Sequence, residues 1–134
     1  MIDTQTWALI ADTYTPVLVF MVLYYLKKSN KVIQKQQAIA LIKAIAVVYL
    51  LMFIDNYFSI WLSMGMDYST HTAIALVFVV VLSYRSLLHL IIASLSLVLY
   101  GLLMRYLNYH SIADVVSTIV VLLPIFILFN RKGQ

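Results

Sequence analysis

A histidine and an aspartate four positions apart, His110 and Asp114, have the clearest capacity for chemistry in this sequence. In a helix the two side chains share a face, and a carboxylate there can bind an imidazole N–H. That contact fixes the imidazole tautomer and stabilises the imidazolium. Arg105 lies five residues before His110 and can fork onto a phosphate or a carboxylate, while His71 begins another apolar segment. This set predicts an anion site in which one imidazole attacks phosphorus and the other protonates the leaving oxygen.

Two short motifs around these histidines resemble motifs of the type 2 phosphatidic acid phosphatase superfamily, the lipid phosphate phosphatases. The run Tyr68-Ser69-Thr70-His71 resembles the Pro-Ser-Gly-His of the second motif. The spacing of Arg105, His110 and Asp114 is similar to the third motif, which is Ser-Arg, five residues, His, three residues, Asp. The stretch 109–115 is also similar to the His-Tyr-Thr-Ile-Asp-Val signature of sphingomyelin synthases, a related branch.

This resemblance implies a role for each matching residue. His110 would attack the phosphoryl group to form a phosphohistidine, Asp114 would orient His110, and His71 would protonate the leaving alkoxide. The phosphate oxygens would be held by Arg105, Ser69 and Thr70, helped by backbone N–H groups at the helix start. The resemblance implies no metal and no cofactor, and its substrate would be a lipid phosphate or an isoprenoid pyrophosphate.

The sequence departs from the family pattern in its positive charges. The first motif, a lysine followed at fixed distance by Arg-Pro, is absent, and only four residues separate Arg105 from His110. Thr70 replaces the glycine of the second motif, and Met104 replaces the serine of the third. Because phosphoryl transfer depends on positioning and charge stabilisation, three alternatives stay open: a slow enzyme, an enzyme that uses a partner's cation, and a chain without catalysis.

Further polar residues lie within apolar segments. Asp55 and Asn56 fit either a polar wall of the same cavity or hydrogen bonds between helices, and both interpretations stay open. Asp12, just before Pro16, fits the second interpretation better.

Two other classes of function compete with a phosphatase. The set His71, His110, Asp114 and Asp55 offers nitrogen and oxygen ligands that zinc accepts. No His-Glu-x-x-His motif supports a metal site, and Arg105 would oppose a cation there. A non-enzymatic or degenerate membrane subunit is the third class, and the absent first motif is its main support.

The amino-acid composition indicates the class of protein that carries these residues. Of the 134 residues, 64% are hydrophobic and 10% are charged, whereas soluble domains average about 45–50% and about 25%. This composition excludes a water-soluble enzyme and a disordered tail. The chain has no cysteine, which excludes disulfides and thiolate sites. Its net charge of +4 is dispersed among apolar segments, which indicates membrane orientation rather than nucleic-acid binding.

The apolar segments predict a single all-α integral membrane domain over residues 1–134. About five helices of membrane-spanning character are expected, near residues 7–25, 44–62, 70–83, 87–104 and 112–129. The third is short, about 21 Å at 1.5 Å per residue.

The basic residues predict the orientation of this bundle. With five spans, one side collects Lys27, Lys28, Lys31, Lys35, Arg85, Arg131 and Lys132. Arg105 alone falls on the opposite side, together with all five aspartates. The positive-inside rule then predicts an outer N-terminus and a cytoplasmic C-terminus. We expect a bacterial plasma membrane protein whose active face lies outside.

Overall fold

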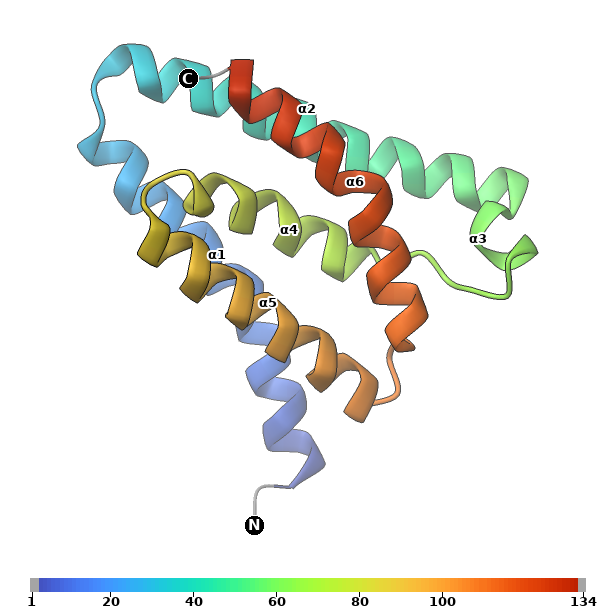
Figure 1. Cartoon of the computed structure of the whole chain (residues 1–134). Helices are drawn as coiled ribbons and strands as arrows, with labels where there is room; N and C mark the ends of the chain where they lie inside the picture. Colours follow the sequence, from blue (N-terminus) through green and yellow to red (C-terminus); the bar gives the residue numbers. More distant parts are fainter. Residues whose placement is uncertain (1–2, 133–134) are drawn as a thin grey trace.

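All regular secondary structure in the computed structural model, which describes residues 3–132, is helical (Figure 1). The elements are α1 (Thr4–Lys28), α2 (Lys31–Phe58), α3 (Ile60–Ser63), α4 (Thr70–Ser83), α5 (Leu87–Tyr106) and α6 (Ile112–Lys132). Four of them, α1, α2, α5 and α6, are long and apolar enough to cross a membrane. The prediction of an all-α bundle of apolar helices is therefore confirmed.

Short polar side chains mark the helix starts. Asp3, Asn30, Ser69 and Ser86 precede α1, α2, α4 and α5, and each accepts a hydrogen bond from the backbone N–H three residues later, over 2.8–3.2 Å. Such a cap satisfies one of the N–H groups that a helix start leaves unpaired. These caps explain why α4 and α5 begin at the residues that hydropathy predicted.

Helix α4 is the centre of the bundle. It packs against α1, α2, α5 and α6, and Figure 1 shows it between them. Ten of its 14 residues are buried, and most of these are alanine and valine. A helix that is apolar on every side is stable only when other helices cover it. With this cover, α4 need not match the hydrocarbon thickness of about 30 Å that a lipid-exposed helix must match.

The first two helices differ from the sequence prediction. The stretch 26–43, expected as a basic connection, is helical except at Ser29 and Asn30. Lysine, glutamine and alanine are good helix formers, and a hydropathy window does not detect a polar helix end. At its other end α2 stops at Phe58, four residues before the predicted end, because Ser59 adopts a left-handed conformation with φ of 55°.

The last three helices bring the candidate site together. The C-terminal end of α5 lies beside the N-terminal end of α6 (Figure 1). The two helices approach closely at Gly101 of α5 and Val115 of α6. A Cβ on Gly101 would lie 3.2 Å from Cγ1 of Val115, so glycine leaves room for the first turn of α6. The linker 107–111, which carries His110, is thereby held near the start of α4.

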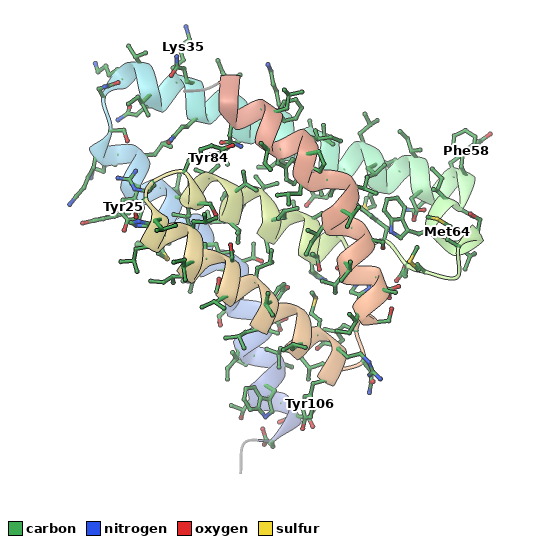
Figure 2. All side chains as sticks on the ribbon, in the orientation of Figure 1. Tyr25, Lys35, Phe58, Met64, Tyr84 and Tyr106 are labelled. Atoms are coloured by element: carbon green, nitrogen blue, oxygen red, sulfur yellow. The ribbon has the colours of Figure 1, made fainter. Side chains whose placement is uncertain are left out.

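The opposite end of α5 has its own polar contacts. His89 Nε2 lies 3.0 Å from the hydroxyl of Tyr25, and the guanidinium of Arg85 stacks 3.9 Å from the centre of the same ring. Figure 2 places Tyr25 at this end of the bundle and Tyr106 at the other. The third histidine, His89, therefore links α1 to α5 and lies far from His110. The side chains of Arg131 and Lys132, used above for the orientation, lie outside the described side chains.

Candidate functional site

Two carboxylates face one ring nitrogen of His110. Nδ1 of His110 lies 3.5 Å from Oδ2 of Asp114 and 3.6 Å from Oδ2 of Asp67. The His110 side chain is 11% exposed and that of Asp67 is 73% exposed. The sequence predicted the approach of His110 to Asp114, although His110 lies just before α6 rather than within it. Asp67, from the linker before α4, is an addition that sequence reasoning missed.

A capping box fixes the carboxylate of Asp114. The backbone N–H of Ser111 donates to Oδ2 of Asp114 over 2.9 Å, and the N–H of Asp114 donates to Oγ of Ser111 over 3.1 Å. A serine three residues before an acidic residue satisfies two unpaired N–H groups reciprocally. Oδ1 of Asp114 accepts a third hydrogen bond, from the backbone N–H of Asp67 over 2.8 Å. Both oxygens of this buried carboxylate are therefore held in place.

Buried hydroxyls lock the start of α4 against α6. The N–H of Ser69 donates to Oγ1 of Thr118 over 3.1 Å, and that hydroxyl donates to the carbonyl of Asp114 over 2.8 Å. The hydroxyl of Ser69 donates to that of Thr72 over 2.7 Å. Ser69, Thr72 and Thr118 are completely buried. Ser69, predicted to bind phosphate, is thus engaged inside the bundle, and its neighbour Thr70 is half-buried.

The other two predicted site residues lie outside this cluster. His71 is exposed on the first turn of α4, and within the described residues it makes no side-chain hydrogen bond or ion pair. Arg105 is exposed at the end of α5, where Nη1 is 3.3 Å from Oδ1 of Asn108. The structure thus brings His110 and Asp114 together, while His71 and Arg105 lie at the surface outside this cluster.

Asp55 shapes the chain between α2 and α4. Its Oδ1 accepts a hydrogen bond from the N–H of Trp61 over 2.7 Å, which closes the turn through Ser59. The indole N–H of Trp61 donates to Ser117 over 2.9 Å, tying this turn to α6. Asn56, which shared the predicted cavity wall with Asp55, is exposed. The hydrogen bond to Trp61 favours the structural interpretation of Asp55.

Tyr68 packs beneath the same turn. Its hydroxyl donates to the carbonyl of Val48 over 2.9 Å, and its ring meets that of Trp61 with centroids 5.0 Å apart. Burial, together with the negative charge of Asp55, raises the pKa of Tyr68 far above its ordinary value of 10. This phenol therefore stays neutral, and it anchors the linker that carries Asp67.

An apolar groove of about 780 Å³ runs between α1 and α5. It is lined by Trp7, Ile10, Thr13, Tyr14, Val17, Ser96, Leu99, Tyr100, Leu102, Leu103 and Tyr106. At its floor the hydroxyl of Tyr14 is 2.7 Å from that of Ser96, and the rings of Tyr14 and Tyr100 lie 4.5 Å apart. Tyr106, at the end of α5 in Figure 2, is the immediate neighbour of Arg105. Neither Asp55 nor Asn56 lines this groove.

The groove could not be predicted from the sequence, because the residues of its two walls lie 79 to 99 positions apart and neither wall has a distinctive motif. Comparison of the chain with known protein families, with curated proteins and with solved structures finds no match. The arrangement of side chains is therefore the basis for the functional argument.

Proposed function

We propose that this chain is a membrane-embedded phosphatase or phosphotransferase that acts on a lipid-linked phosphate through a phosphohistidine on His110. The observation that carries the proposal is the orientation of the imidazole. Nδ1 faces the fixed carboxylate of Asp114, which leaves Nε2 directed away from it as the nucleophile. A nucleophile oriented by a base partner that is itself held by further hydrogen bonds is the recurring pattern of covalent catalysis.

In the proposed reaction Nε2 of His110 forms a bond to phosphorus while the bond from phosphorus to the alkoxide oxygen breaks. His71 donates a proton to that oxygen. Water then attacks the phosphohistidine and gives a proton to His71, the bond from phosphorus to Nε2 breaks, and the imidazole is restored as phosphate leaves. In a transferase reaction a second alcohol attacks in the same way and also gives its proton to His71. Asp114 stabilises the positive charge that develops on the ring.

Arg105 is the proposed phosphate ligand, supported by the half-buried Thr70 at the start of α4, whereas Ser69 is buried and engaged by Thr72 and Thr118. Arg105 is exposed and has one long hydrogen bond to Asn108, so its guanidinium can turn toward a ligand. The carboxylate of Asp67 opposes an anion near His110, and the positive charge that develops on the ring as Nε2 attacks phosphorus offsets this repulsion. With one cation, the expected turnover is slow, because each missing oxyanion donor costs about 10²–10³ in rate.

The groove between α1 and α5 supports a lipid substrate. Its walls are apolar, its volume is in the range of small-molecule sites (about 300–1,000 Å³), and its Tyr106 end adjoins Arg105. A lipid phosphate or isoprenoid pyrophosphate would place its tail in the groove and its head at Arg105.

The proposed topology has five crossings, with α4 as the short, enclosed one. The N-terminus is outside, the C-terminus is cytoplasmic, and the site lies at the outer face of a bacterial plasma membrane. Charge supports this topology, because Lys27, Lys28 and Arg85 lie at the end of the bundle opposite Arg105.

The decisive experiment measures phosphate release by the purified chain in lipid nanodiscs from a panel of lipid phosphates and pyrophosphates. His110→Ala should abolish release, and His71→Ala should lower it. His89→Ala is the matched control, because it removes a histidine at the opposite end and should retain the rate. Equal release by wild type and His110→Ala would refute the nucleophile. No release from any lipid by a folded protein would favour a non-enzymatic subunit.

A further inference from the structure

We propose that Asp67, His110 and Asp114 form a binding site for a divalent transition metal ion, with zinc as the best fit. One nitrogen and two carboxylate oxygens lie within 4.8 Å of one another. Nδ1 of His110 is buried and makes no hydrogen bond within the described residues, although two carboxylates face it. A bound cation would satisfy a buried nitrogen that has two anionic neighbours and no hydrogen bond.

The distances distinguish a metal site from a direct hydrogen bond. A charge-assisted N–H···O bond would be about 2.7–2.9 Å long, and the observed separations are 3.5 and 3.6 Å. Zinc binds nitrogen and oxygen at about 2.0–2.2 Å in a tetrahedron, which places ligand atoms about 3.3–3.6 Å apart. The two distances from Nδ1 therefore leave room for an ion.

The surroundings of Asp114 resemble the outer shell of a metal site. Each oxygen already accepts one backbone hydrogen bond, from Asp67 or Ser111, and a carboxylate oxygen has a second lone pair for an ion. Ligating carboxylates in metalloproteins are usually oriented in this way. The same bond from the Asp67 backbone holds the linker so that the Asp67 side chain reaches His110.

Charge and ligand type select the ion. Two carboxylates and a neutral imidazole have a net charge of −2, which a divalent cation balances. Imidazole favours zinc and similar transition metals over magnesium and calcium, which prefer oxygen-only sites. Asp67 is 73% exposed, so its carboxylate can close onto the ion while water completes the tetrahedron.

This inference assigns a regulatory role that rests on the proposed function. A metal on Nδ1 withdraws electron density from the ring and displaces the proton that Asp114 would stabilise. Bound zinc should therefore inhibit attack by Nε2 on phosphorus.

Direct binding tests the site without reference to turnover. The chain in nanodiscs, stripped with a chelator, is titrated with zinc against a fluorescent zinc indicator, and the bound metal is counted by elemental analysis. We expect one zinc per chain. Asp67→Asn should weaken binding about 10–100-fold, and His110→Ala should remove saturable binding. Asp12→Asn, an exposed carboxylate on α1 outside the cluster, should bind like wild type.

Absence of saturable zinc binding in wild type would overturn the metal site, as would unchanged affinity in Asp67→Asn. Asp67 is exposed, so its asparagine variant should fold even if His110→Ala does not. Zinc binding without phosphate release would leave the metal site standing and remove the phosphatase proposal. Phosphate release without zinc binding would support the phosphatase proposal and overturn the metal site.

Discussion

The backbone N–H of Asp67 donates to Oδ1 of Asp114 over 2.8 Å, joining two residues that are 47 positions apart. One carboxylate thereby links the linker before α4 to the first turn of α6. The same group faces His110 through its other oxygen. Asp114 therefore has a structural role and a proposed role in catalysis, so a substitution there is expected to change both stability and activity.

Substitution of Asp114 should destabilise the chain more than substitution of its capping partner. Ser111→Ala removes one side-chain acceptor, and a lost cap of this kind costs about 1 kcal/mol. Asp114→Ala leaves the N–H groups of Asp67 and Ser111 unpaired, at about 1–3 kcal/mol for each one that stays buried. Thermal unfolding in detergent should give the order wild type, Ser111→Ala, Asp114→Ala. Equal midpoints for the two variants would contradict the bridging role.

Gly101 and Val115 should show energetic coupling. A methyl group on Gly101 would lie 3.2 Å from Cγ1 of Val115, so Gly101→Ala should displace the first turn of α6, and Gly101→Leu should do so more severely. Overpacking of this kind costs about 1–3 kcal/mol for the larger side chain. Val115→Ala should partly restore Gly101→Leu in a double-mutant cycle of unfolding midpoints. Purely additive effects would show that the two helices do not meet there.

Hydropathy predicted the starts of three helices well. The apolar runs were predicted to begin near Thr70, Leu87 and Ile112, which are the first residues of α4, α5 and α6. In the structure a serine side chain caps each of these starts. The end of α2 could not be predicted, because its break at Ser59 depends on the hydrogen bond from Trp61 to Asp55. Because the sequence stays apolar through this turn, hydropathy alone does not detect the break.

The candidate site was predictable only where its residues are close in sequence. The spacing of His110 and Asp114 indicated their contact, which a capping box then enforces. Asp67 gave no such signal, because its approach to His110 depends on α4 packing against α6. His71 and Arg105 have suitable chemistry, but both side chains are exposed, and periodicity cannot predict whether an exposed side chain turns toward another segment.

Filling the groove between α1 and α5 should select against long lipid tails. Leu102→Trp places a bulky ring in the groove, so the KM for a long-chain lipid phosphate should rise several-fold while a short-chain phosphate is unaffected. Leu90→Trp is the control, because Leu90 is an exposed residue of α5 outside the groove. Phosphate-release kinetics in nanodiscs provide the comparison. Equal effects of both variants on both substrates would exclude the groove as the tail site.

Tyr68 should make the fold sensitive to strong base. Its pKa is raised in the folded chain, so the unfolded chain loses this proton first, near the ordinary value of 10. The unfolded state then binds fewer protons than the folded state, and stability falls as pH rises above about 10.

Tyr68→Phe loses the hydrogen bond to Val48, worth about 1 kcal/mol, and also loses the part of the pH dependence that comes from Tyr68. Unfolding midpoints from pH 8 to 11 should therefore decline less steeply in Tyr68→Phe than in wild type. Tyr57→Phe, which changes an exposed tyrosine, should decline as wild type does. Parallel curves for wild type and Tyr68→Phe would show that Tyr68 does not carry this pH dependence.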